Sequence, residues 1–147
     1  MTDQAVIHVI DDDDAVRQSL AFLLSTAGYE VEEHPSARAF ANGPLAALGA
    51  SAGCIITDVR MPDMTGIELL ELIQERGITV PVVVITGHGD VPLAVAAMKL
   101  GAADFLEKPF DDVAILDVVK AALARRQKTH QHDALREEVA ERVAALS

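Results

Sequence analysis

The sequence is poor in aromatic residues, in cysteine and in positive charge, and each shortage excludes a class of protein. Only 3% of its 147 residues are aromatic, so the core that its 50% of hydrophobic residues can form is aliphatic. The single cysteine, Cys54, cannot form an internal disulfide, and its place at the start of an apolar run predicts a buried side chain. A formal net charge of -11 argues against direct binding to a nucleic-acid backbone, which requires a basic surface.

Long apolar runs are also missing. No stretch approaches the roughly 20 apolar residues that a membrane-spanning helix needs. The N-terminal residues lack the basic region and hydrophobic core of a signal peptide. We therefore expect no membrane association and a cytoplasmic location.

What the sequence does contain is a regular alternation of short apolar runs and helix-like segments. Runs rich in Val and Ile are typical of parallel strands that are buried on both faces. The predicted strands cover residues 5–10, 29–33, 53–57, 80–85 and 103–106, and a helix follows each of them. The pattern predicts an α/β fold, a doubly wound five-stranded parallel sheet, in one domain over residues 1–125.

Capping residues and glycines predict where the helices begin and end. The expected N-caps are Ser36, Thr65 with Glu68 in a capping box, Asp90 and Asp111. The second helix is predicted only to about Phe40, with a further turn over 45–48. The last helix is expected to bury a stripe made of Val113, Leu116, Val119, Ala122 and Leu123.

The composition changes beyond Arg125. Residues 126–133 have no apolar face and indicate a linker, whereas Leu135, Val139, Val143 and Leu146 recur at helical spacing. Residues 126–147 are therefore predicted to be a linker and an amphipathic helix, a C-terminal helical extension of the domain. Because so short a helix is marginal in isolation, we expect it to dock on a partner, pair with its own copy or lead into a further domain.

Polar residues follow the predicted strands at the point where each strand ends. The set comprises Asp11, Asp12, Asp58, Thr86 and Lys108. Because parallel strands share one carboxyl edge, where open α/β sheets bind ligands, we expect these five side chains to converge on one cleft. A solvated loop residue or a helix cap explains any one of them as well, but it does not explain five at matching strand ends.

Three carboxylates in one cleft constrain its chemistry. Two like charges about 4 Å apart repel by roughly 4 kcal/mol at an effective dielectric near 20, so either some carboxyls are protonated or a cation binds among them. Hard divalent ions such as Mg²⁺ prefer oxygen ligands of this kind. A carboxylate beside Mg²⁺ can attack a phosphoryl group, while an ammonium and a hydroxyl contact the phosphoryl oxygens. The pattern indicates a Mg²⁺-dependent phosphoryl-transfer site.

Four motifs occur in order on these strand ends and carry a resemblance to a known family. They are residues 9–13 (VIDDD), 57–66 (TDVRMPDMTG), 84–90 (VITGHGD) and 105–110 (FLEKPF). Together they resemble the CheY-like receiver domains of response regulators, with particular similarity to the FixJ-type branch. Members of that branch carry a LuxR-type helix-turn-helix output domain.

The resemblance implies a flavodoxin-like (βα)5 receiver fold and a role for the acids. Asp58 would be the phosphoacceptor. Asp11 and Asp12, together with Asp58 and the backbone carbonyl of Arg60, would hold Mg²⁺. No other cofactor is implied.

The resemblance also assigns the remaining cleft residues. Lys108 would neutralise phosphoryl charge, and Thr86 and Phe105 would form the switch pair. Two departures from the family pattern are small. Phe105 lacks the hydroxyl of the tyrosine that many relatives have, and Thr57 is more polar than the usual neighbour of the phosphoacceptor.

Two details of the assignment stay open. Four consecutive acids, residues 11–14, leave the register uncertain in principle. Because the predicted strand ends at Ile10, we assign the first two acids to the metal, leave Asp13 solvated and expect Asp14 to cap the next helix. Relatives usually have a cis bond at the position of Lys108-Pro109, whereas base rates for X-Pro bonds favour trans.

A two-component signalling mechanism follows from the resemblance. A sensor histidine kinase would donate its phosphoryl group to Asp58, and the added charge would draw the Thr86 hydroxyl inward and vacate space for Phe105. The helix at 91–100 and the fifth strand would then form a phosphorylation-dependent homodimer. DNA binding is expected only through an output domain that is absent from this chain. The segment 142–147 is similar to the beginning of such output domains.

Two other functional classes fit parts of the sequence. A Mg²⁺-dependent phosphohydrolase with an aspartyl-phosphate intermediate commonly has a second acid two residues after the nucleophile, where this chain has Arg60. A degenerate receiver that only binds partners is disfavoured by the intact set of acids, Thr86 and Lys108. We therefore expect no enzyme beyond Mg²⁺-dependent self-phosphorylation and dephosphorylation.

Overall fold

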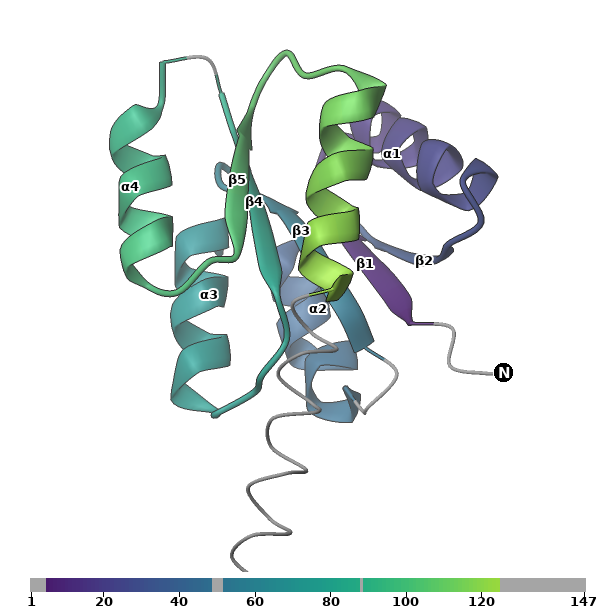
Figure 1. Ribbon diagram of the computed structural model, residues 1–147. Helices are drawn as coiled ribbons and strands as arrows, with labels where there is room; N and C mark the ends of the chain where they lie inside the picture. The colour runs from purple at the N-terminus through teal and green to yellow at the C-terminus, as the bar shows by residue number, and fades with distance from the viewer. Residues whose placement is uncertain (1–4, 49–51, 88, 125–147) are drawn as a thin grey trace, which may run out of the picture.

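The computed structural model of the protein describes residues 5–48, 52–87 and 89–124. The predicted linker and amphipathic helix at 126–147 lie outside the described residues. Five parallel strands alternate with helices along the chain (Figure 1). The strands are β1 (Val6–Ile10), β2 (Glu30–His34), β3 (Ala52–Asp58), β4 (Val82–Thr86) and β5 (Asp104–Glu107).

The strands form one sheet in the order β2-β1-β3-β4-β5. Every neighbouring pair is parallel. The chain therefore passes from β1 outward to one edge and returns through β3 to the other edge, which is the doubly wound arrangement expected from the sequence. All five carboxyl ends lie along one edge of the sheet, and the site is built there.

Helices cover both faces of the sheet. They are α1 (Asp14–Thr26), α2 (Ala37–Asn42), a 3-10 turn at Pro44–Ala47, α3 (Gly66–Glu75), α4 (Val91–Lys99) and a helical segment at 112–124. The helices α2, α3 and α4 pack on one face, whereas α1 and the segment 112–124 pack on the other (Figure 1). The fold is the flavodoxin-like α/β arrangement.

The core is aliphatic, as the low aromatic content predicted. All residues of β4 are buried, which explains why that strand is a continuous apolar run rather than an alternating one. Each fully buried Ile or Leu contributes roughly 1.5–3 kcal/mol relative to an exposed one. Cys54 is completely buried among these side chains, and its burial raises the pKa of the thiol to about 12. It acts as a small core residue.

Most of the predicted helix caps are confirmed. Ser36 accepts the N–H of Ala39, and Thr65 and Glu68 form a reciprocal capping box at the start of α3. The cap of α1 is one residue earlier than expected. Asp13 has an extended backbone and its carboxylate accepts the N–H of Val16, while Asp14 is already the first helical residue.

The buried face of the helical segment 112–124 agrees with the prediction except at its beginning: Val119 and Ala122 are buried, and Leu116 and Leu123 are partly buried against the same core. Ile115, Val119 and Ala122 are buried, whereas Val113 is 65% exposed. Ile115, which the prediction did not include, takes the place of Val113 on this face. Packing against the strand side chains decides that exchange.

Candidate functional site

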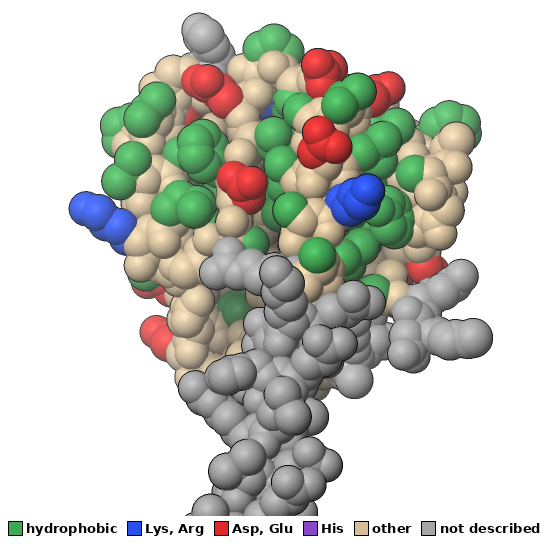
Figure 2. Space-filling view, viewed as in Figure 1, with side chains coloured by type: hydrophobic (Ala, Val, Ile, Leu, Met, Phe, Trp, Pro, Cys, Tyr) green, Lys and Arg blue, Asp and Glu red, His purple; other side chains and the backbone are tan. Residues whose placement is uncertain are grey.

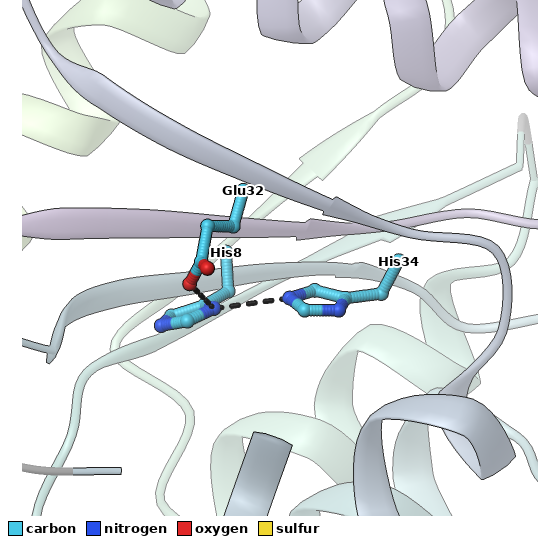
Figure 3. Close-up of side chains that lie close together, drawn as sticks. All are labelled: His8, Glu32 and His34. Atoms are coloured by element: carbon cyan, nitrogen blue, oxygen red, sulfur yellow. Dashed lines mark hydrogen bonds and ion pairs between the residues drawn. The ribbon is translucent and has the colours of Figure 1, made fainter. Parts of the chain in front are cut away.

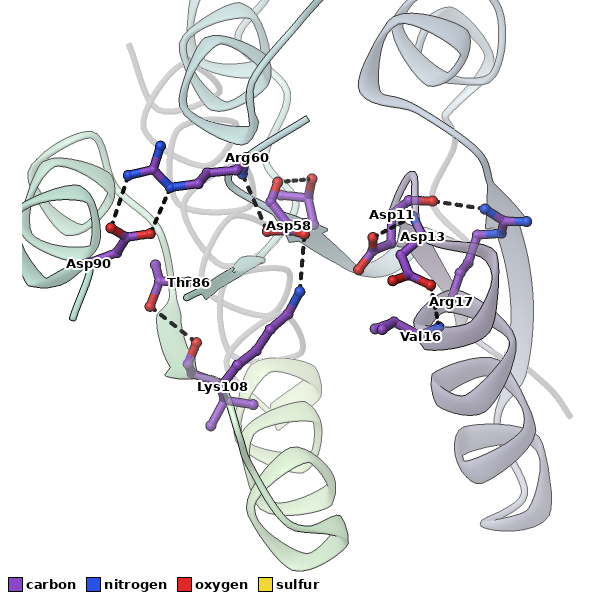
Figure 4. A network of polar contacts seen from close by, with 11 residues as sticks. Asp11, Asp13, Val16, Arg17, Asp58, Arg60, Thr86, Asp90 and Lys108 are labelled. Carbon is purple, nitrogen blue, oxygen red and sulfur yellow. Dashed lines mark hydrogen bonds and ion pairs between the residues drawn. The ribbon is translucent and has the colours of Figure 1, made fainter. Parts of the chain in front are cut away.

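Four strands bring the predicted polar residues to one edge of the sheet (Figure 4). Asp11 follows β1, Asp58 ends β3, Thr86 ends β4 and Lys108 follows β5. These four strands are consecutive neighbours in the sheet. Ligand oxygens of Asp11, Asp12 and Asp58 all lie within 4.8 Å of one another. The three acids therefore lie together as predicted, and Lys108 is bonded to one of them.

Asp58 lies at the centre of the site and is only 8% exposed. Its Oδ2 accepts a hydrogen bond from Nζ of Lys108 at 3.2 Å, and its Oδ1 accepts the backbone N–H of Arg60 at 3.3 Å. The neighbouring Thr57 is fully buried, and its hydroxyl donates to the backbone carbonyl of Asp58. The unusual polar neighbour thus has a hydrogen-bond partner.

A glycine allows α3 to begin directly beside this carboxylate. A Cβ atom on Gly66 would lie 2.5 Å from the backbone oxygen of Asp58 and 3.0 Å from Cα of Val59. Both neighbours are backbone atoms, which cannot move away as a flexible side chain could. The N–H of Gly66 also donates to the carbonyl of Val59. The close approach fixes the loop between β3 and α3.

The carboxylate of Asp11 has unequal oxygens. Oδ1 accepts the N–H of Asp13 at 2.9 Å, whereas Oδ2 is buried and has no hydrogen-bond partner among the described residues. Burial raises the pKa of Asp11, and repulsion from Asp58 adds to the effect. A buried oxygen without a partner normally costs 1–3 kcal/mol. This oxygen, in a cluster of oxygen donors that includes the exposed Asp12, fits a hard divalent cation.

Thr86 and Phe105, the predicted switch pair, lie on neighbouring strands, where Phe105 pairs with the residue two before Thr86. Thr86 is 1% exposed, and its hydroxyl donates to the backbone carbonyl of Leu106 at 3.4 Å. Phe105 is 40% exposed. The hydroxyl of Thr86 is therefore engaged with β5 and not with Asp58.

Arg17 is a residue of the site that the sequence analysis did not identify. Its guanidinium is buried in α1 and donates to the backbone carbonyl of Asp11 at 2.8 Å. It also contacts the carboxylates of Asp14 at 2.7 Å and Glu33 at 3.3 Å. Arg17 therefore anchors the loop that carries the acids. The sequence does contain a sign of this role: Arg17 lies three residues before Leu20 and therefore on the buried face of the same helix.

A second ion pair joins the loops on either side of the site. Arg60 binds the carboxylate of Asp90 through two hydrogen bonds of 2.8 and 2.9 Å. Asp90 occupies the predicted N-cap position of α4, but its side chain makes no capping hydrogen bond. The bond from Arg60 instead lowers the pKa of Asp90. No local sequence pattern indicates a pair separated by 30 residues.

The Lys108-Pro109 bond is cis, as the resemblance suggested and against the base rate for X-Pro bonds. Asp63, in the loop after Asp58, is the only non-glycine residue with positive φ in the described part of the chain. In the same part of the chain, every helix is too short or too polar to cross a bilayer.

Fold and site together define a class: a flavodoxin-like α/β domain whose carboxyl edge holds three carboxylates opposite a lysine. The chain belongs to the response regulator receiver domain family, whose model matches residues 7–120. Among curated proteins it is 55% identical over 147 residues to the transcriptional regulatory protein FixJ of Azorhizobium caulinodans, covering 100% of this chain and 68% of the relative. It is 47% identical to FixJ of Bradyrhizobium diazoefficiens, covering 100% and 70%.

Solved structures agree with this assignment. The crystal structure of FixJ-N is 48% identical, with a TM-score of 0.76, and the match covers 84% of this chain and 96% of that one. Full-length FixJ from B. japonicum is 46% identical, with a TM-score of 0.81, over 99% of this chain and 70% of the other. The protein therefore contains a FixJ-type receiver domain of a two-component response regulator.

Proposed function

We propose that Asp58 accepts a phosphoryl group from a phosphohistidine of a sensor histidine kinase. The observation that carries this proposal is the position of its carboxylate. It ends β3 with one oxygen bonded to Lys108 and two further carboxylates within 4.8 Å. An oxygen of Asp58 bonds to phosphorus while the phosphorus–nitrogen bond of the donor breaks, and the leaving imidazole keeps the electron pair and takes up a proton.

Asp11, Asp12, Asp58 and the backbone carbonyl of Arg60 are the groups that would hold Mg²⁺. The buried oxygen of Asp11 without a partner supports this assignment. When bound, Mg²⁺ would neutralise charge on the phosphoryl oxygens. Lys108 supplies a second positive charge from the side of Asp58 opposite to Asp11. Its ammonium group needs only to shift from a carboxylate oxygen of Asp58 to a phosphoryl oxygen.

Thr86 responds to the added charge on Asp58. Its hydroxyl gives up the long bond to the carbonyl of Leu106 and turns toward the phosphoryl group. The space that it leaves admits the ring of Phe105, which is now partly exposed. The surface formed by α4 and β5 changes as a result.

That surface is the proposed homodimer interface. Large apolar side chains are exposed there, and Figure 2 shows hydrophobic side chains gathered over α4 and β5. They are Val91, Val95, Met98 and Phe105. Dimerisation in turn is proposed to control a C-terminal DNA-binding output domain, in a cytoplasmic regulator with no substrate turnover beyond its own phosphorylation and dephosphorylation.

Incubation with Mg²⁺ and acetyl phosphate tests the site, with intact mass as the readout. We expect one phosphoryl group per chain and none in Asp58→Asn. Asp63→Asn is the matched control, because it makes the same charge change in the same loop and asparagine tolerates the positive φ of this position. Labelling of Asp58→Asn at the wild-type rate removes Asp58 from its role. Rapid turnover of the donor supports a phosphohydrolase, and no labelling supports a phosphorylation-independent binding domain.

Light scattering of the phosphorylated and unphosphorylated protein tests the dimer. Val95→Glu is expected to keep the phosphorylated chain monomeric. Phe22→Glu, which alters an apolar residue on α1 that is even more exposed than Val95, is the control and should leave the dimer intact. Equal masses with and without phosphorylation contradict the switch.

A further inference from the structure

Two histidines and a glutamate meet between β1 and β2, in a group that the phosphorylation mechanism does not use (Figure 3). His8 is paired in register with Glu32 on the neighbouring strand, and His34 follows two residues further along β2. Residues two apart on a strand share a face, so all three side chains point to the same side of the sheet. The strand register therefore fixes the group without any loop.

The donor atoms of this group have nearly the spacing that a bound ion requires. Nδ1 of His8 lies 3.0 Å from Nε2 of His34 and 3.5 Å from Oε2 of Glu32. A tetrahedral Zn²⁺ ion with bonds of about 2.0–2.1 Å has ligand atoms about 3.3–3.4 Å apart. The two histidine nitrogens would need to move apart by only a few tenths of an ångström to hold the ion.

Packing holds both imidazoles in place. The rings of His8 and His34 are stacked with centroids 5.2 Å apart, and the ring of Phe40 from α2 packs against both at 5.4 and 4.8 Å. Both histidines are buried, whereas Glu32 is exposed. Glu32 thus leaves one side of the group open to solvent, which gives an ion a route of entry and a position for a water ligand.

The protonation state suits metal binding. Burial lowers the pKa of His8, and burial together with repulsion from His8 lowers that of His34 to about 4. Both rings are therefore neutral at pH 7, and neutral imidazole is the form that binds metal. The two facing nitrogens share one proton in the metal-free protein. On binding, that proton moves to the outer nitrogen of its ring, so both rings stay neutral.

We propose that His8, Glu32 and His34 form a site for Zn²⁺, separate from the acidic pocket. The two sites differ in donor chemistry. Two imidazole nitrogens and one carboxylate suit a borderline ion such as Zn²⁺, whereas an all-oxygen cluster suits Mg²⁺. β2 is an edge strand that is bonded only to β1 within the sheet. Zn²⁺ in this site clamps β2 to β1 through its ligands, in addition to the backbone hydrogen bonds.

The test is zinc binding by competition with a chromophoric chelator, in excess Mg²⁺ so that the acidic pocket is occupied. The chain has 5 histidines, so the parent protein for the test carries alanine at His88, His130 and His132. We expect one Zn²⁺ per chain. Co²⁺ in the same protein should give the visible absorption of a tetrahedral site with nitrogen ligands.

Variants identify the ligands. His34→Gln is expected to weaken zinc binding by roughly 100-fold, and Glu32→Gln by roughly tenfold, because loss even of a residue that only supports a metal ligand typically costs about 10–100-fold in affinity. Glu30→Gln is the matched control, because it removes a charge from the same face of β2 and should leave affinity unchanged. Circular dichroism verifies that each variant is folded.

Three results overturn the proposal: no zinc uptake by the parent protein, unchanged affinity in folded Glu32→Gln and His34→Gln, or equal losses in Glu30→Gln and Glu32→Gln. The first leaves the histidines as a stacked core pair. Since the readout is zinc affinity, it is independent of phosphoryl transfer to Asp58.

Discussion

Replacing Asp11 by asparagine should stabilise the protein without Mg²⁺ and abolish the stabilisation that Mg²⁺ provides. Asp11 is 1% exposed, and its carboxylate lies within 4.8 Å of that of Asp58. At an effective dielectric near 20, two charges at that distance repel by roughly 3 kcal/mol. Lys108 and salt reduce this figure, so we expect a net gain of about 1–2 kcal/mol.

Asparagine also resolves the local hydrogen bonding. Its amide oxygen can still accept the N–H of Asp13, and its amide nitrogen replaces the oxygen that has no partner. The donor can then point at the carboxylate of Asp58. For a domain of this size, a gain of 1–2 kcal/mol raises Tm by about 4–8 °C.

Mg²⁺ should reverse the order of stability. A ligand at a hundredfold excess over its Kd stabilises the folded state by about 2.7 kcal/mol. The wild-type protein is expected to gain this free energy, whereas Asp11→Asn lacks one of the proposed Mg²⁺ ligands and should not. The wild type, which is expected to be the less stable of the two in EDTA, should therefore become as stable as Asp11→Asn or more stable at saturating Mg²⁺.

Urea denaturation followed by circular dichroism, in EDTA and in Mg²⁺, measures both effects. Asp13→Asn is the matched control: it changes the acid two residues further along, which caps α1, and asparagine is an equally good cap. Its stability should follow the wild type under both conditions. If Asp11→Asn is less stable than the wild type in EDTA, or responds to Mg²⁺ to the same extent, the reasoning from charge repulsion is wrong.

Three further predictions concern the scaffold of the site. Gly66→Ala should lower the free energy of unfolding by about 1–3 kcal/mol in urea denaturation and should slow acetyl-phosphate labelling, because the added Cβ collides with the backbone of Asp58. Unchanged labelling would contradict that contact. Thr65→Ala should lower the free energy of unfolding by about 1 kcal/mol in the same assay, and Glu68→Ala should lower it less. A loss below about 0.3 kcal/mol for Thr65→Ala would mean that the capping box does not stabilise α3. Cys54, with its buried thiol of raised pKa, should react with a thiol reagent only in denaturant; rapid reaction of the native protein would show that β3 opens.

Much of this protein follows from local sequence. The apolar runs of β1, β3 and β4 predict buried strands because burial on both faces removes the usual alternation, and β4 is the clearest case. The capping box of α3 is determined by residues three apart, so no tertiary information is needed to predict it. The convergence of Asp11, Asp58 and Lys108 follows once the strands are parallel, since their carboxyl ends share one edge.

Tertiary structure decided what depends on residues distant in the chain. Whether Val113 or Ile115 joins the buried face of the segment 112–124 depends on the strand surface that the segment meets, and Ile115 packs against that surface. The pairing of Arg60 with Asp90 depends on how two loops are placed. The contact of His8 with His34 depends on the register between β1 and β2. Periodicity within a segment sets which residues share a face, but only packing between segments determines what each face contacts.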